Sequence, residues 1–318
     1  MKLWEEAVKI DLFGTEMYAF GLFCAIGALA SALALGALCR EGGAKKGGAA
    51  LTFLMSGGLG LIVSRLAFCL MNRSLGMTMP FSAWFRITEG GWSTVGLIFG
   101  ALLGVLPAAA LLRERWERLF DFVGLSLPLT LAAIRFGEGK IPGFNVSRPL
   151  PAGFPVGNIL TVQDTKYEDV FYLATWRIGC VFFLCLFLAL TVFLIGKNRR
   201  EGDTGTLFLL LCGAGGILLE SLRYDHFLEF SFVRLEQVAY GLVLVFGVAR
   251  AIRSRKRGPA WPAIALTAAA IGVSAGVEFA LDRTSISHPL LYAIMVAALA
   301  LPVWMALRGI TGKGTERA

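Results

Sequence analysis

The sequence predicts an all-α, polytopic integral membrane protein with about nine transmembrane helices, the N-terminus outside and the C-terminus inside. Hydrophobic residues make up 56% of the 318 residues and charged residues only 16%, whereas soluble domains carry about 25% charged residues. Apolar runs recur along the chain, each near the roughly 20 residues that cross about 30 Å of hydrocarbon. The basic residues, finally, divide unevenly between alternate loops.

Nine segments have the length and composition of a membrane span, at about 16–39, 49–72, 92–112, 119–136, 170–196, 205–222, 236–252, 261–281 and 289–308. The first seven form one block, and the basic stretch RSRKRGPAWP (253–262) separates them from the last two. We therefore expect three parts: an interfacial segment at 1–15, where Trp4 and Phe13 suit a membrane surface, a seven-span domain at 16–252, and two extra spans with a tail at 253–318. The first apolar run is too long for a cleavable signal peptide.

Loop charge predicts the orientation, because basic loops stay on the cytoplasmic side. One set of alternate loops, including the C-terminal tail, carries 17 of the 30 Lys and Arg residues, and the other set, including the N-terminal segment, carries 10. The N-terminus is therefore expected outside, together with the loops 73–91 and 137–169. Loops as long as 137–169 are usually functional or disordered.

Composition also argues against some classes of site. The six cysteines include no CxxC pair and the chain has two histidines, so a tetrahedral metal site is not expected. The cysteines suit small buried apolar positions. The net charge of +8 comes without a basic face interleaved with aromatic residues, and we interpret it as membrane topology, with no nucleic-acid partner.

Charged side chains within the spans gather in the halves that face outside, while the inner halves are nearly all Leu, Ala, Phe, Val and Gly. A charge near the bilayer centre costs about 2.5–3.5 kcal/mol on insertion scales, so such residues normally pair and mark function. The clustering predicts a polar cavity open to the outer surface or outer leaflet; separate salt bridges and snorkelling side chains are the alternative. The residues are Arg65, Arg135, Arg177, Arg223, Glu138, Glu220, Glu236 and Glu278.

The stretch AAIRFGEGKIPG (132–143) places Arg135 and Glu138 on one helix face, at the C-terminal end of a span. The helix dipole there favours the arginine and disfavours the carboxylate, so Glu138 requires a cation. The candidates are Arg135, Lys140, Arg65 and Arg223. We expect Lys140 or Arg65 to be the partner, which would leave Arg135 to bind a phosphate group.

Glycines accompany these charges. Gly137 and Gly139 allow the backbone to turn and a ligand to approach closely. The segments SGGLGLIVSR (56–65) and CGAGGILLESLR (212–223) both place glycines before an outer-half arginine. Because small residues let membrane helices approach each other, we expect close helix contacts at both segments.

Several segments between Tyr18 and Arg250 resemble bacterial prolipoprotein diacylglyceryl transferases. MYAFGLF (17–23) is similar to the family's first-span Tyr-Gly segment, with Tyr18 on its functional tyrosine, and GLIVSRLAFCLMN (60–72) to its Gly-Arg stretch, with Arg65 on the arginine. RITEGGWSTVGLIFG (86–100) is similar to the family's Gly-Gly-x-Ser-x-His-Gly-Gly segment, and DFVGLSLPLTLAAIRFGEG (121–139) to the aspartate-to-arginine run that leads into the family signature. GDTGTLFLLLCGAGGILLESLR (202–223) aligns Glu220 and Arg223 with its sixth span.

The resemblance implies a transferase that moves diacylglycerol from phosphatidylglycerol, or a related anionic phospholipid, to a lipobox cysteine thiol beside a prolipoprotein signal peptide. It implies the outer face of the bacterial plasma membrane as the location, and no cofactor or metal. Acyl-glycerol transfer needs a phosphate grip and a base for the thiol. The expected catalytic residues are Glu138, Tyr18 and Arg135, and the expected substrate-binding residues are Arg65, Arg223, Glu220, Lys140 and Gly137.

The chain also departs from the family pattern. The signature Gly-Arg-x-Gly-Asn-Phe-x-Asn-x-Glu reads IRFGEGKIPG here, so that Glu138 replaces an asparagine, and Ile141 and Gly143 replace the later Asn and Glu. The family's histidine falls near Thr94 or Val95, and a span-six arginine near Gly216. Two alternatives therefore stay open: a non-catalytic lipid- or peptide-binding protein on the same scaffold, and a transporter.

Overall fold

A computed structural model of the chain is an all-α membrane bundle, as the sequence predicts. It describes residues 7–12, 14–74, 81–85, 91–151, 153–164, 167, 169–196, 200–225, 228–231, 233–254 and 261–311. Nine helices within these ranges are long and apolar enough to cross a membrane. They are α1 (Ala19–Glu41), α2 (Gly48–Ser74), α3 (Thr94–Leu112), α4 (Trp116–Glu138), α5 (Thr175–Ile195), α6 (Asp203–Ser221), α7 (Leu235–Ser254), α8 (Trp261–Arg283) and α9 (His288–Thr311).

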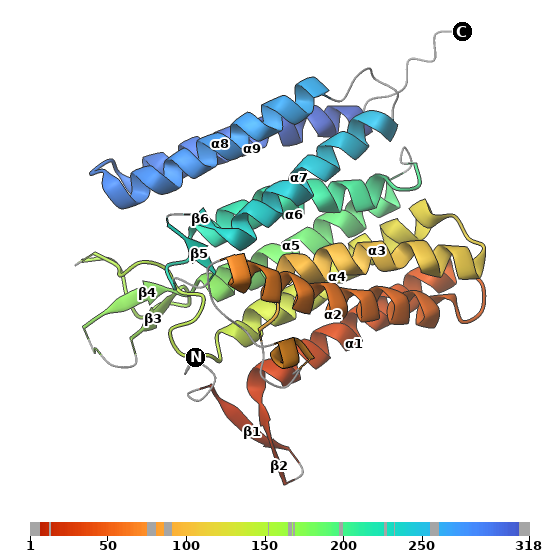
Figure 1. Ribbon diagram of the computed structural model, residues 1–318, viewed down its shortest axis with the longest axis horizontal. Helices are drawn as coiled ribbons and strands as arrows, with labels where there is room; N and C mark the ends of the chain where they lie inside the picture. The colour runs from red at the N-terminus through yellow and green to blue at the C-terminus, as the bar shows by residue number, and fades with distance from the viewer. Residues whose placement is uncertain are drawn as a thin grey trace.

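Three short antiparallel hairpins lie at one end of the bundle, which we call the hairpin end (Figure 1). They pair β1 (Lys9–Leu12) with β2 (Thr15–Tyr18), β3 (Thr161–Gln163) with β4 (Phe171–Leu173), and β5 (Glu229–Phe230) with β6 (Val233–Arg234). A 3₁₀ helix, η1 (Phe81–Phe85), follows α2. The loops at the opposite end are short.

The structure corrects the start of the fifth span. The expected span at 170–196 required residues 170–174 to be helical, but they are not. Helix α5 begins at Thr175, because Phe171–Leu173 pair with Thr161–Gln163 in the β3–β4 hairpin. The 137–169 loop therefore contains regular structure. The N-terminal segment at 1–15 includes β1, whereas Trp4 and Phe13 lie outside the described residues.

Helices α4 and α6 form the buried centre of the bundle. In the most apolar stretch of each helix, 72% of the residues of α4 and 78% of those of α6 are buried. A side chain at Gly124 of α4 would lie 3.0 Å from the Cα of Gly205 of α6, so the two backbones approach closely. Asp121 of α4 accepts hydrogen bonds of 2.8 Å from the backbone N–H groups of Gly202 and Gly205. The buried carboxylate thus satisfies N–H groups at the start of α6, where a negative charge is favoured.

The helices α8 and α9 pack on α6 and α7. Hydrogen bonds near the hairpin end also connect the two helix pairs. The Tyr292 hydroxyl donates to the backbone oxygen of Ser221 at 3.1 Å, and the Gln237 amide donates to the Glu278 carboxylate at 2.9 Å. Arg148, from the loop between α4 and α5, donates to the backbone oxygen of Leu281 at 3.2 Å. The C-terminal pair is therefore attached to segments that carry the site described below.

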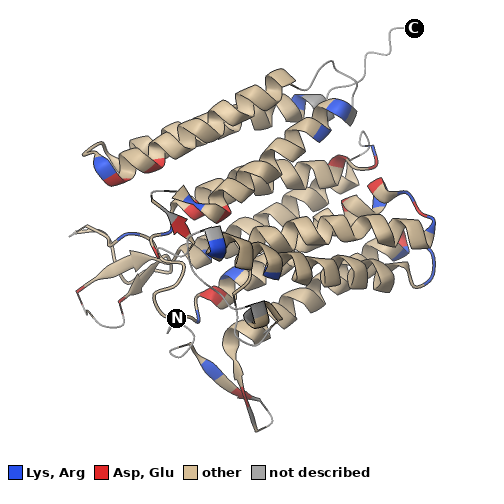
Figure 2. Cartoon of the chain, in the orientation of Figure 1, with Lys and Arg blue, Asp and Glu red and all other residues tan. Residues whose placement is uncertain are grey.

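Charged residues concentrate at the two ends of the bundle, and the helix midsections are mostly uncharged (Figure 2). The hairpin of β1 and β2 and the last residues of α9 lie at opposite ends of the bundle (Figure 1), in keeping with an odd number of spans. The direction across the membrane stays a prediction from the loop charges.

Selective labelling of introduced cysteines tests this direction. In a variant without the six native cysteines, Phe154→Cys at the hairpin end should react with a membrane-impermeant maleimide in intact cells, because the loop is predicted outside. Arg115→Cys, at the opposite end, should react only after the membrane is permeabilised. Labelling of Arg115→Cys alone in intact cells would show that the orientation is inverted.

Candidate functional site

A cavity of about 1310 Å³ lies between the helix pair α1–α4 and the helix pair α2–α3. At the hairpin end its lining is polar and includes Tyr18, Arg65, Asn72, Ser93, Thr94 and Glu138. Farther along the helices its lining is apolar and includes Leu35, Phe53, Ala101 and Val123. Leu54 and Leu61 also line it and are 63% and 56% exposed. The cavity therefore reaches the lipid-facing surface.

Glycines widen this cavity. Gly57 and Gly58 line it, and no atom lies within 4 Å of where their Cβ atoms would be. The expectation of close helix contacts is wrong for these two residues. It is confirmed one turn later at Gly60, whose Cβ would lie 3.0 Å from a Leu97 methyl of α3, and at Gly216, whose Cβ would lie 2.2 Å from the Tyr240 ring. Adjacent glycines thus serve opposite purposes, since Gly60 faces a helix and the other two face space.

Arg65 lies at the polar mouth of the cavity. Its Nη1 donates to the backbone oxygen of Gly91 at 2.8 Å, and its Nε to that of Trp84 at 3.3 Å. The guanidinium also lies over the rings of Phe68 and Trp92, at 5.7 and 5.8 Å. These contacts hold the cation at the cavity wall.

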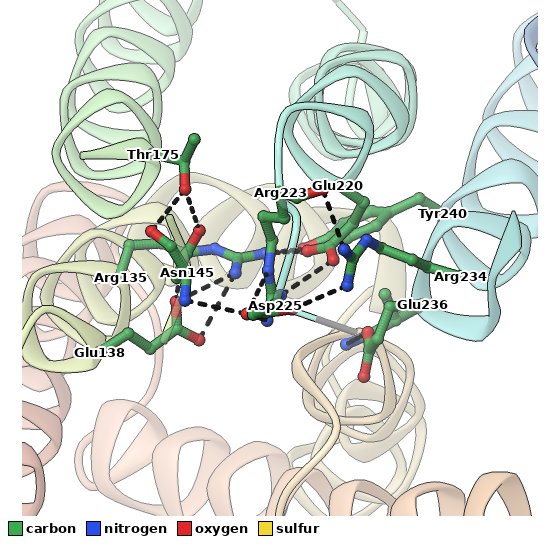
Figure 3. Close-up of polar contacts among 11 residues, drawn as sticks. Arg135, Glu138, Asn145, Thr175, Glu220, Arg223, Asp225, Arg234, Glu236 and Tyr240 are labelled. Atoms are coloured by element: carbon green, nitrogen blue, oxygen red, sulfur yellow. Dashed lines mark hydrogen bonds and ion pairs between the residues drawn. The ribbon is translucent and has the colours of Figure 1, made fainter. Parts of the chain in front are cut away.

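Arg135 lies in a buried ionic network (Figure 3). Its Nη1 is 3.1 Å from Glu138 Oε2 and its Nη2 is 2.6 Å from Glu220 Oε1, and the residue is 1% exposed. The Asn145 amide donates to the same Glu138 oxygen at 2.5 Å. The expectation that Glu138 pairs with Lys140 or Arg65 is wrong, because the residue three positions earlier on the same helix face is its buried partner.

Lys140 contacts aromatic rings instead of Glu138. Its ammonium lies 5.4 Å from the ring centre of Phe136 and 5.9 Å from that of Phe23. Gly137 packs against α1, where an added Cβ would lie 3.1 Å from the Cβ of Phe23. The close approach that Gly137 permits is thus one between two helices, and not the expected approach of a ligand.

The network continues from α6 into the loop that follows it. Arg223 Nη1 is 2.9 Å from Glu220 Oε2, and its Nη2 is 2.7 Å from Asp225 Oδ2. Arg234 Nη1 is 2.8 Å from Asp225 Oδ1, and the Asn145 backbone N–H donates to Asp225 at 2.9 Å. The two arginines hold the pKa of Asp225 well below its usual range against the opposing effect of burial. Three arginines and three carboxylates leave the network without net charge.

The expected site residues therefore divide between two places. Tyr18, Arg65 and Glu138 line the cavity. Arg135, Arg223 and Glu220 lie in the network, which Glu138 joins to the cavity. The expectation that Arg65, Arg135 and Arg223 face one phosphate-sized space is wrong, since carboxylates enclose the last two. Arg177 lies elsewhere and donates to the backbone oxygen of Ile159.

Sequence reasoning missed Asn145 and Asp225 in loops, Arg234 at the end of β6 and Thr175 at the start of α5. Thr175 Oγ1 donates to Asn145 Oδ1 at 2.7 Å, which orients the amide toward Glu138. Asn145 and Asp225 each follow a charged helix end within a few residues, and this was their only signal. Glu236 was expected in the cluster; its carboxylate accepts the Val95 N–H at 3.2 Å, so it reaches the position of the family's histidine from α7.

Comparison with known proteins agrees with these features. The family described as prolipoprotein diacylglyceryl transferase matches residues 7–253. The phosphatidylglycerol–prolipoprotein diacylglyceryl transferase of Fervidobacterium nodosum is 27% identical over 60% of this chain and 65% of its own length. That of Symbiobacterium thermophilum is 26% identical over 51% and 60% of the two chains, and that of Oceanobacillus iheyensis 24% identical over 79% and 88%. The chain thus spans less than two thirds of the first two relatives, and α8 and α9 lie beyond the matched residues.

The network predicts a large cost for removing one buried charge. Asp225→Asn preserves shape but leaves Arg223 and Arg234 without their shared carboxylate, so we expect a loss of about 3–5 kcal/mol of stability. Because the pKa of Asp225 is lowered by folding, its contribution is fully present above the unfolded pKa of about 3.9 and is lost as pH falls through the folded pKa. Thermal unfolding of purified protein between pH 8 and pH 3 measures the start of this loss, which begins as pH approaches the unfolded pKa.

Glu16→Gln is the matched control, since Glu16 pairs with Lys9 in an exposed ion pair at 3.2 Å whose expected contribution is under about 1 kcal/mol. Asp225→Asn combined with Arg234→Met should recover part of the loss, because it removes one of the two cations that lose the Asp225 carboxylate. Equal melting temperatures for Asp225→Asn and Glu16→Gln would contradict the network's role in stability.

Proposed function

Because the chain belongs to the prolipoprotein diacylglyceryl transferase family, we propose that it transfers diacylglycerol from phosphatidylglycerol to a cysteine thiol of a prolipoprotein. The reaction takes place at the outer face of the bacterial plasma membrane, on a lipobox cysteine beside the signal peptide. The names of the relatives support both substrates. The single observation that carries the proposal is the cavity between α1–α4 and α2–α3.

The shape and polarity of the cavity suit a two-chain phospholipid. Its volume of about 1310 Å³ exceeds the roughly 300–1,000 Å³ of ordinary small-molecule pockets. The polar mouth, with Arg65, would take the phosphate headgroup, and the apolar length beside Gly57 and Gly58 would take the acyl chains. Because exposed side chains line one side, a lipid could enter from the membrane without crossing water.

The proposed chemistry is a displacement at the carbon of the diacylglycerol unit that is bonded to the phosphate oxygen. The acceptor sulfur forms a bond to this carbon, the carbon–oxygen bond to phosphate breaks, and glycerol phosphate leaves. Arg65 stabilises the leaving phosphate electrostatically. The thiol proton passes to Glu138, the carboxylate that lines the cavity, and then to the leaving phosphate. Tyr18, also at the mouth, is the alternative base.

In this proposal Arg135 is a positioning residue and not the phosphate grip. Its guanidinium holds Glu138 on one side and Glu220 on the other, so it fixes the direction of the Glu138 carboxylate. Glu220 and Arg223 then fix Arg135 through the network. The phosphate contact is left to Arg65, because both carboxylates already neutralise Arg135.

A non-catalytic lipid-binding protein is the second candidate, and a specific observation favours it. Glu138 stands where the family signature has an uncharged asparagine, and it pairs directly with Arg135. If the family chemistry needs that arginine for phosphate, this chain binds lipid without transfer. Activity of the wild-type protein separates the two candidates.

The decisive assay follows labelled diacylglycerol from phosphatidylglycerol to a lipobox peptide in proteoliposomes. Wild type should be active, and Arg65→Ala and Glu138→Gln should each lower kcat/KM more than about tenfold, or about 1.4 kcal/mol. Arg135→Ala should abolish transfer, because Glu138 loses its anchor. Arg177→Ala, away from the site, should retain activity. An inactive wild type would contradict transfer from phosphatidylglycerol to the lipobox peptide. A gain of activity in Glu138→Asn would indicate that the wild-type protein is the non-catalytic lipid-binding candidate.

Filling the cavity tests the lipid site. Gly58→Leu places a side chain in the open space beside Gly58, and the KM for phosphatidylglycerol should rise at least about fivefold through lost binding. Gly36→Leu is the matched control, a helical glycine of α1 with equal space and outside the cavity lining. The same KM in both variants would contradict the assignment of the cavity to the lipid.

A further inference from the structure

A second, smaller cleft of about 360 Å³ lies at the hairpin end, outside the helix bundle. One wall is a face of the β3–β4 sheet, where Val162 pairs with Tyr172 and Tyr172 forms a bridge to Pro149. All three side chains line the cleft. The lining also includes Lys140 and Trp176. The cleft is therefore built mostly from the loop between α4 and α5 and the ends of those two helices, and Val8 and Tyr224 complete it.

The cleft and the lipid cavity approach each other at the end of α4. Glu138 lines the cavity, and the next two residues, Gly139 and Lys140, line the cleft. The ionic network lies beside the cleft, because its loop residue Asn145 is flanked in the chain by the cleft-lining Phe144 and Val146. Thr175 and Asp225 likewise stand next to the cleft-lining Trp176 and Tyr224.

The lining of the cleft suits an uncharged chain segment. It is mostly apolar and aromatic, and among the residues that the structure describes its charged side chains are one cation, Lys140, and one anion, Asp164, which balance. The volume of about 360 Å³ lies at the lower limit of the roughly 300–1,000 Å³ typical of ligand sites. The cleft is thus too small for a two-chain lipid but has room for a short, extended piece of polypeptide.

We propose that this cleft binds the acceptor polypeptide, through the uncharged, water-exposed segment that flanks its cysteine. The proposal rests on the transferase function and adds the place of the second substrate. A transferase must bring a lipid from the membrane and a thiol from a protein to one point. With the lipid in the cavity and the polypeptide in the cleft, the thiol reaches Glu138 at the border between them.

Separate Michaelis constants for the two substrates test the proposal. Val162→Trp fills the cleft from its β3 wall, so the KM for a synthetic lipobox peptide should rise at least about tenfold while the KM for phosphatidylglycerol changes less than about twofold. Gly58→Leu should give the reverse pattern. Ile159→Trp is the matched control, since Ile159 is 79% exposed and does not line the cleft. An unchanged peptide KM in folded Val162→Trp, or equal changes for both substrates, would overturn the proposal.

A crosslinking experiment measures peptide binding at the cleft independently of catalysis. A photoreactive residue introduced at Gln163, an exposed cleft-lining position, should crosslink a fluorescent lipobox peptide whose cysteine is replaced by serine. The same group at Ile159 should not, and excess unlabelled peptide should suppress the signal. Crosslinking without transfer would remove the transferase function but keep the peptide site. Transfer without crosslinking at Gln163 would remove the cleft assignment and keep the function.

Discussion

The salt bridges of Arg135 to Glu138 and Glu220 are the interaction on which the site depends. A guanidinium buried in the membrane region is tolerated only with partners that compensate its lost hydration. These partners come from the end of α4 and the end of α6, so the ion pairs join the two central helices. Arg223 and Asp225 carry the same constraint into the loops, where Asp225 is bonded to Asn145 and Arg234. Local loop structure is thus determined by a charge within the bundle.

The buried network holds as many arginines as carboxylates. Arg135, Arg223 and Arg234 are each matched by a carboxylate. Arg65 lies outside this network, at the wall of a large cavity. Glu138 belongs to the network through Arg135 and also lines the cavity. A carboxylate oriented by an arginine and an amide loses little freedom on meeting a substrate, which is the requirement for a preorganised base.

Hydropathy was sufficient to predict the helical bundle, because spans have a fixed length and apolar composition. Charged residues within the apolar spans also located the cluster near Arg135. The pairing within that cluster was not predictable, since both Lys140 and Arg135 lie close to Glu138 in sequence and only the packed helices show which cation is buried with it. Asn145 and Asp225 were missed because loop residues have no periodicity to indicate where they fold. Gly57 and Gly58 were misread because the sequence does not distinguish a glycine that faces a helix from one that faces a cavity.

Asp121 fastens α4 to α6 at the end of the bundle opposite the Arg135 salt bridges. The same two helices are therefore held together near both ends, by the Asp121 hydrogen bonds at one end and by the Arg135–Glu220 salt bridge at the other. Gly124 packs against Gly205 near Asp121. Of the helices that line the cavity, α1, α2 and α3 lie outside this doubly joined pair. We expect a change in the width of the cavity to move these three helices relative to α4 and α6.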